Sequence, residues 1–181
     1  KSLLIAHTAT GGGLWSKSEL STLSGKKIAA QGIARDVLKG LGAVVSNMNS
    51  TKEGAALASG TLDAVEMSHI VEALEAGVTK AARFAIMPGL TREGSTLAVS
   101  LKREFWDALG SEAQAVVTEV AADTCRRTTA DLRVNDRMLR KVLSEANGLS
   151  IVSQSPVHAT EIARVAEAVV ADIAARDALS R

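Results

Sequence analysis

The sequence predicts an α/β fold, in which a mixed, mostly parallel sheet is flanked by helices and a long helix lies in the C-terminal half. Three observations support this class. Short apolar runs suited to buried strands alternate with segments whose apolar residues recur every three or four positions. A strand, a helix and a strand follow one another closely over residues 26–48, and such units build parallel sheets. Helix-favouring sequence then continues from residue 111 to about residue 146.

The expected strands are short aliphatic runs, bounded by glycine, proline or polar residues that interrupt regular structure. They fall at residues 3–7, 26–30, 43–48, 62–66, 83–87, 95–101 and 149–152. Between the first two, the glycines at 11–13 break the pattern, and residues 16–24 are expected to form a polar connection. No internal repeat or low-complexity tract is present.

The expected helices have apolar residues at helical spacing and glycine at their ends. They fall at residues 33–41, 50–60, 68–76, 105–110 and 111–146, with a last helix that begins at Pro156. Gly42 and Gly148 follow two of them, as expected for a residue that terminates a helix in the left-handed conformation. Pro156 after Ser155 has the order expected at a helix N-terminus.

Two helix starts have the spacing of a capping box, in which a serine and an acid or amide three residues later satisfy each other's backbone N–H groups. The pairs are Ser50 with Glu53 and Ser111 with Gln114. Because the helix that begins at Ser111 is long for a globular protein, we expect it to bend near residues 128–129, where two β-branched threonines are adjacent.

Composition excludes several classes of protein. The 181 residues carry 21 basic and 20 acidic side chains, for a net charge of +1, so nucleic acid and anionic membranes are not expected partners. A hydrophobic content of 46% is too high for a disordered chain. The single cysteine, Cys125, rules out an internal disulfide and a multi-cysteine metal cluster.

An enzyme is one alternative. A small α/β hydrolase or transferase would use His7 or His69 together with Glu66, but no histidine has a recognisable catalytic or zinc-binding spacing. A two-lobed effector-binding regulatory domain is a second alternative, although no basic helix-turn-helix segment is present.

Two charged residues are the strongest candidates for ligand contact. Glu66 ends a predicted strand, where open α/β sheets bind their ligands, although it could also be a solvated loop acid. Arg92 lies in a glycine-containing loop and could hold a carboxylate through two hydrogen bonds, or could pair with Glu93 at the surface.

Four segments in the same order resemble the TRAP-transporter solute-binding proteins of the DctP type. Residues 23–43 are similar to the "DLKGLKIR … GA" stretch of that family, and residues 55–66 to its "aLqtGviDgaE" segment. Residues 88–94 resemble the "PGwhEPG" loop of its keto-acid-binding branch, and residues 105–114 the "aWdaLp-e-Q" start of its long helix. The resemblance covers about residues 13–178.

The resemblance implies a two-lobed, type II periplasmic-binding-protein-like fold, of which the chain is the C-terminal portion. Residues 25–101 would form an α/β lobe, and residues 102–181 the long helices and a last strand that reach back to the other lobe. The N-terminal lobe would be mostly absent.

The implied function is binding and not catalysis. Such a protein is extracytoplasmic, loses its signal peptide, and captures a small organic acid in the periplasm for the membrane subunits of a TRAP permease. No cofactor is expected, and a cation that accompanies the ligand is left open. Because a partial lobe exposes apolar surface, a homodimer is included among the candidate partners.

The resemblance also implies a set of cleft residues. In the family an arginine follows the lysine-isoleucine pair and holds the ligand carboxylate, but Ala29 stands there in this chain, so Arg92, or less favourably Arg35, is the expected replacement. A tryptophan of the keto-acid branch is replaced by Met67, and the two changes together leave the ligand open between an unusual acid, a neutral compound and no ligand at all. The expected ligand-binding residues are Ala29, Met48, Asn49, Glu66, Met67, Gly89 and Arg92.

Overall fold

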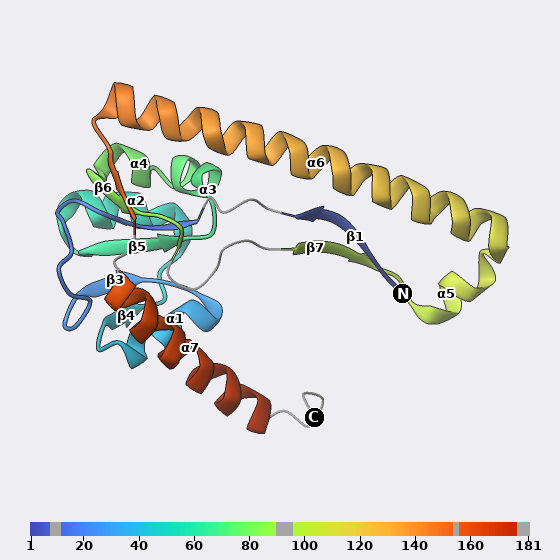
Figure 1. Cartoon of the computed structure of the whole chain (residues 1–181), viewed down its shortest axis with the longest axis horizontal. Coiled ribbons are helices and arrows are strands. Elements are labelled where there is room, and N and C mark those ends of the chain that lie inside the picture. Colours follow the sequence, from blue (N-terminus) through green and yellow to red (C-terminus); the bar gives the residue numbers. More distant parts are fainter. Residues whose placement is uncertain (8–11, 90–95, 154–155, 177–181) are drawn as a thin grey trace.

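The computed structural model describes residues 1–7, 12–89, 96–153 and 156–176. Figure 1 shows two parts: a body built on a six-stranded sheet, and an arm formed by β1, β7, α5 and the first part of α6. The strands are β1 (Ser2–His7), β2 (Gly13–Ser16), β3 (Lys27–Ala29), β4 (Val44–Ser46), β5 (Ala64–Met67), β6 (Phe84–Ile86), β7 (Thr96–Ser100) and β8 (Ser150–Val152). The helices are α1 (Gly32–Gly40), α2 (Ser50–Ser59), α3 (Ile70–Glu75), α4 (Val78–Ala81), α5 (Arg103–Ala108), α6 (Gly110–Asn147) and α7 (Pro156–Arg176).

The six strands of the body have the order β4-β3-β5-β2-β6-β8. β3 runs parallel to both β4 and β5, with Ile28 opposite Val45 on one side and Ala64 on the other. β6 and β8 are also parallel, whereas β2 lies antiparallel between β5 and β6. The predicted α/β fold with a mixed, mostly parallel sheet is therefore confirmed, and β3, α1 and β4 form the expected βαβ unit.

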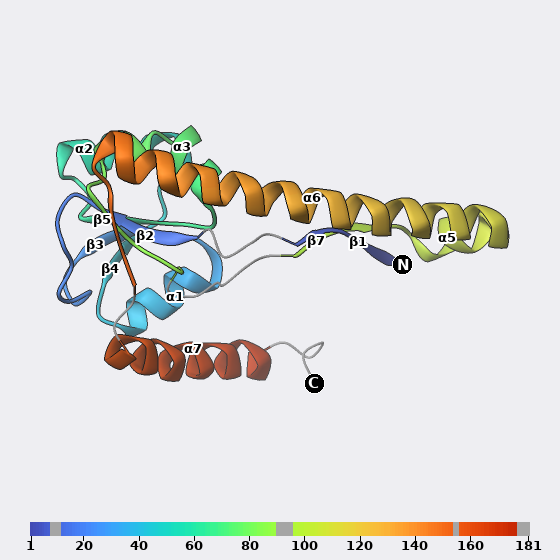
Figure 2. The same cartoon turned by 45° about the horizontal axis from the view of Figure 1, so that its top comes forward.

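Alternation along the strands divides the body into two hydrophobic cores, one on each face of the sheet. Trp15, Val65 and Met67 point to the face covered by α2, α3, α4 and the end of α6. Leu14 and Ile28 point to the opposite face, where α1 and α7 pack against them. Figure 2 shows α6 and α7 on opposite sides of the sheet.

The arm is a separate two-stranded antiparallel ladder, in which Ser2 lies opposite Ser100 and His7 opposite Thr96. β1 also packs against α6, and the backbone N–H of His7 donates to Thr129 Oγ1 at 3.0 Å. The predicted strand at residues 3–7 therefore forms, but in the arm and not in the main sheet. None of the helices within the described ranges is long and apolar enough to cross a membrane.

Several local predictions are wrong. β2 was expected to belong to an irregular connection, and α4 was not expected at all. α6 is one uninterrupted helix that runs without a sharp bend in Figure 1, so the bend predicted near residues 128–129 is absent. The capping box at Ser111 is also absent, because Gln114 Nε2 instead donates to the backbone carbonyl of Trp106 at 2.8 Å.

The capping box predicted for Ser50 and Glu53 is wrong as well. The residue that caps α2 is Asn49, whose Oδ1 accepts hydrogen bonds from the backbone N–H of Thr51 at 3.1 Å and from its hydroxyl at 3.0 Å. Helix α2 ends at Gly60, which has a φ of 79°. Because Asn49 supplies the cap, the Glu53 side chain is not used at the helix start and is instead buried.

Candidate functional site

A cavity of about 280 Å³ lies at the edge of the sheet where β3 and β5 end. In sheets of this type, the carboxyl ends of the parallel strands form the usual ligand-binding edge. The cavity is lined by Gln31, Gly32, Glu53, Glu66, Ser68 and Glu72. Three of these six residues are glutamates, so the cavity is strongly acidic.

The β5 end of the cavity is held by reciprocal hydrogen bonds at the start of α3. His69 caps this helix, with Nδ1 accepting from the backbone N–H of Glu72 at 3.1 Å. Glu72 Oε2 in turn accepts from the backbone N–H of Ser68 at 3.0 Å. These two hydrogen bonds hold the Glu72 carboxylate at the wall of the cavity, which Glu66 of β5 also lines.

Glu53 enters the cavity from α2 and is only 3% exposed. Its burial depends on Gly54, since a Cβ at that position would collide with the backbone carbonyl of Ala76. The glycine lets α2 approach the turn between α3 and α4 closely. Helix α2 therefore lies deep enough to bury Glu53 beside Glu72.

Burial first, and then the charges of Glu72 and Glu66, together raise the pKa of the Glu53 carboxyl from its ordinary value of 4.5 to about 7. Loss of hydration and two neighbouring negative charges both disfavour the carboxylate. Near neutral pH the Glu53 carboxyl can therefore keep its proton, and a positive charge that enters the cavity would favour the ionised carboxylate.

The sequence-predicted site residues are only partly brought together. Glu66 lines the cavity and is 7% exposed. Ala29 and Met67 are buried in the core around Trp15, and Met48 packs against the same core. None of these three side chains lines the cavity.

The other predicted residues lie elsewhere. The Asn49 side chain is used as the cap of α2, at the exposed end of that helix. Gly89 is buried, but Arg92 lies outside the described residues. Arg35, the second candidate for a replacement clamp, lies on α1, where its Nε is 3.4 Å from Asp36 Oδ1.

Both histidines considered for an enzyme have other partners at their ring Nδ1 atoms. The ring of His7 lies in the arm, with Nδ1 3.2 Å from Thr96 Oγ1. His69 uses its Nδ1 as the helix cap of α3.

Sequence reasoning missed Glu53, Glu72, Gln31, Gly32 and Ser68. A signal for Glu53 was present: it precedes Ala56 and Leu57 by three and four residues, so it occupies the buried face of its helix. An acid at such a position has to be explained by a partner or a site. The signal was hidden because Ser50 and Glu53 also have capping-box spacing.

The three glutamates do not form a preformed metal site. Over the described ranges, no group of three or more histidine, cysteine, aspartate or glutamate side chains is arranged so that it could hold a metal ion.

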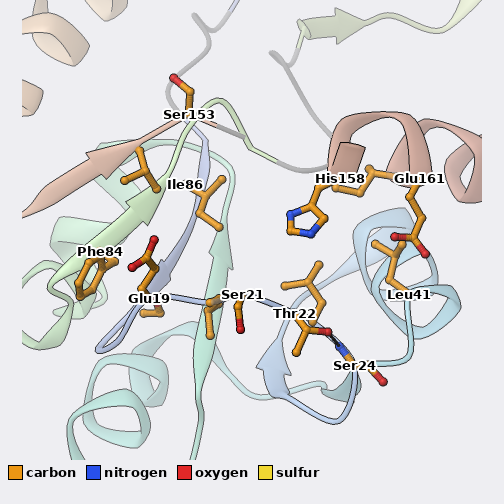
Figure 3. Close-up of a pocket in the computed structure, with 15 residues that line it drawn as sticks. Glu19, Ser21, Thr22, Ser24, Leu41, Phe84, Ile86, Ser153, His158 and Glu161 are labelled. Atoms are coloured by element: carbon orange, nitrogen blue, oxygen red, sulfur yellow. Dashed lines mark hydrogen bonds between the residues drawn. The ribbon is translucent and has the colours of Figure 1, made fainter. Parts of the chain in front are cut away.

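A second cavity, of about 360 Å³, lies on the sheet face covered by α7 and the connection at residues 17–24. Figure 3 shows His158 of α7 and Ile86 of β6 pointing toward its centre. Its buried polar side chain, Ser16, already donates from Oγ to the carbonyl of Ser18 at 2.7 Å, and its glutamates, Glu19 and Glu161, are exposed. The smaller cavity, with buried charged groups at the ligand-binding edge, is therefore the stronger candidate.

Comparison with known proteins places the chain in a family. Residues 18–177 match the model of "bacterial extracellular solute-binding protein, family 7" (DctP). The chain is 29% identical over 154 residues to a monocarboxylate 2-oxoacid-binding periplasmic protein of Nostoc sp., covering 82% of this chain and 42% of that one.

Solved structures of TRAP periplasmic solute-binding proteins share the fold. One from Colwellia psychrerythraea, with bound calcium and pyruvate, has a TM-score of 0.82 and 22% identity over 99% of this chain and 56% of its own. One from Pseudoalteromonas atlantica, with bound sodium and pyruvate, has a TM-score of 0.77 and 23% identity over 99% and 55%. The chain spans about half the length of these proteins or less. With a family match over most of its length, the chain belongs to the bacterial extracellular solute-binding protein family 7.

Proposed function

We propose that the chain is the C-terminal portion of the periplasmic solute-binding subunit of a TRAP-type transporter, with the acidic cavity as part of its ligand site. The observation that carries this proposal is the family match over residues 18–177, together with the position of Glu66 at the carboxyl end of β5. Permease subunits in the membrane would receive the solute, and neither nucleic acid nor a catalytic step is involved. That two copies of the chain form a homodimer is a separate prediction.

The proposed solute is a small organic acid. This follows the relatives, one named for 2-oxoacids and two holding pyruvate with sodium or calcium. A cation that accompanies the acid would lie beside Glu66, whose carboxylate is a suitable oxygen ligand for either ion. Oxygens of the solute would complete its coordination, since the described side chains do not do so alone.

The acid's own carboxylate needs a further partner. Ala29 is fully buried in the core and offers no hydrogen-bond donor from its side chain. We assign this role to Arg92, whose loop follows Gly89 in the sequence, with two hydrogen bonds from its guanidinium group to the carboxylate. Binding would favour the closed arrangement of the lobes only through its higher affinity for that state.

A thermal-shift screen of the full-length protein tests this function. The compounds are 2-oxoacids, dicarboxylates and neutral polyols, each with and without sodium or calcium. At about a hundredfold excess over its Kd, a true ligand should add about 2.7 kcal/mol to the free energy of unfolding.

Arg92→Ala should abolish the shift caused by acids, while the control Arg164→Ala, an exposed substitution on α7, should leave it unchanged. A shift with neutral polyols alone would show that the ligand is not an acid. No shift with any compound would contradict the proposed function.

A further inference from the structure

The Glu53 carboxylate is buried in the cavity without a partner. The residue as a whole is 3% exposed, its side chain lines the cavity, and within the described ranges no hydrogen bond or salt bridge reaches its carboxylate. Glu72, by contrast, receives a backbone N–H. A charged group buried in this way destabilises the fold, so an unpaired acid at a ligand-binding edge indicates that the partner is supplied from outside.

The surroundings specify the chemistry of that partner. The carboxylates facing Glu53 are those of Glu72 on α3 and Glu66 on β5, and all three accept hydrogen bonds when ionised. The remaining walls come from Gln31, Gly32 and Ser68, which are uncharged. The group that fits beside Glu53 is therefore a positively charged hydrogen-bond donor.

At the position beside Glu53, an ammonium group fits better than a metal ion held by the three glutamates alone. The described acids are not arranged around a common metal position. An ammonium group has three N–H donors that can reach acceptors in different directions, and it does not need a closed set of ligands. The cavity volume of about 280 Å³ leaves room for an ammonium group together with further atoms of a small solute.

From this geometry we propose that Glu53 binds the ammonium group of the solute. The solutes that the protein binds would then be amino acids or other acids that carry an amine. This inference rests on the proposed function and narrows its substrate class. The amine end would lie against Glu53 and Glu72.

Matched pairs of compounds test the inference by isothermal titration calorimetry on the full-length protein at pH 8. L-alanine is compared with pyruvate, and L-valine with 2-oxoisovalerate, because each pair differs in the amine. The amino acid should bind about tenfold more tightly or better, as expected for a charge-assisted hydrogen bond.

Glu53→Gln should weaken binding of the amino acid about tenfold or more and leave the oxoacid nearly unchanged. This substitution preserves size, and the control Glu75→Gln removes an exposed acid on α3 that is not in the cavity. Titrations are repeated with chelator, sodium or calcium, so that an inorganic cation at Glu53 is distinguished from an amine.

Each result is decisive. If oxoacids bind more tightly than amino acids and Glu53→Gln leaves both affinities unchanged, the inference is overturned and the proposed function stands. If Glu53→Gln removes only a dependence on sodium or calcium, an inorganic cation occupies the position and the ammonium assignment is wrong. If no acid of either kind binds, the proposed function fails, and the inference that rests on it fails too.

Discussion

At the scale of one residue, the ionised Glu53 carboxyl lowers the free energy of unfolding. In the folded chain its pKa is about 7, whereas in the unfolded chain it returns to the ordinary value of 4.5. Between these pH values the unfolded state releases a proton that the folded state keeps. The free energy of unfolding therefore falls as the pH rises through this window.

We predict that Glu53→Gln stabilises the protein at pH 8 and has little effect at pH 5. The gain at pH 8 should be at most about 3 kcal/mol, because the neutral amide never has to be ionised inside the cavity. Urea unfolding from pH 4 to pH 9 measures the effect, with Glu75→Gln as the exposed control. Parallel stability profiles for the wild type and Glu53→Gln would contradict the raised pKa.

At the scale of one element, helix α2 depends on a cap that also stands among the predicted ligand residues. Asn49 Oδ1 accepts from the backbone N–H of Thr51, which otherwise would lack a partner within the helix. The two roles of Asn49 can be separated by substitution, since aspartate keeps the capping oxygen but removes the amide donor.

We predict that Asn49→Ala lowers the free energy of unfolding by about 1 kcal/mol and that Asn49→Asp retains most of the stability. Chemical denaturation of both variants measures this. If the side chain acts only as a cap, ligand affinity should survive in Asn49→Asp. A stability loss that is equal in both variants would contradict the capping role.

Most strands and helices of the body could be predicted from local pattern, because β3, α1, β4 and β5 each have apolar residues at a clear spacing. β2 could not. It contains four residues, and it is a strand because Gly12 and Gly13 let it fit between β5 and β6. A Cβ on Gly12 would lie 2.7 Å from the Ser68 carbonyl oxygen, and one on Gly13 would lie 3.0 Å from that of Ile86. Such close approach is a property of the assembled sheet.

The site was predictable only where a residue follows a strand. Glu66 could be placed because the edge of a parallel sheet is a general location for ligands. The positions of Glu53 and Glu72 depend on how α2 and α3 pack together, which the spacing within either helix does not report. Local capping rules favoured a different role for Glu53, and tertiary packing overrode them.

At the scale of the whole molecule, α6 carries an exposed apolar stripe. Its members are Val116, Val120, Val134, Met138 and Val142. At about 100° per residue they fall within about 80° of arc, on one face of the helix. The ion pair of Asp123 with Arg127 lies on the same face between Val120 and Val134, so the exposed apolar surface is divided into two clusters, and such clusters are candidate surfaces for association.

We predict that the chain forms a homodimer through this stripe and that the double substitution Val120→Asp with Met138→Asp makes it monomeric. Val120 is 60% exposed and Met138 is 61% exposed, so the substitutions leave the two hydrophobic cores intact. Light scattering after gel filtration measures the mass, with Val170→Asp on α7 as the control. If the wild-type chain is monomeric at a protein concentration of roughly tens of micromolar, the prediction is contradicted.

The continuity of α6 has a mechanical consequence. Its 38 residues extend about 57 Å, from α5 at the end of the arm to Leu143 in the core beside Trp15. Near the body it contacts α3, the helix that holds Glu72. A rotation of about 5° where α6 meets α3 would move its far end by about 5 Å. By this geometry, a small rotation of α6 beside the cavity would become a larger displacement at the tip of the arm.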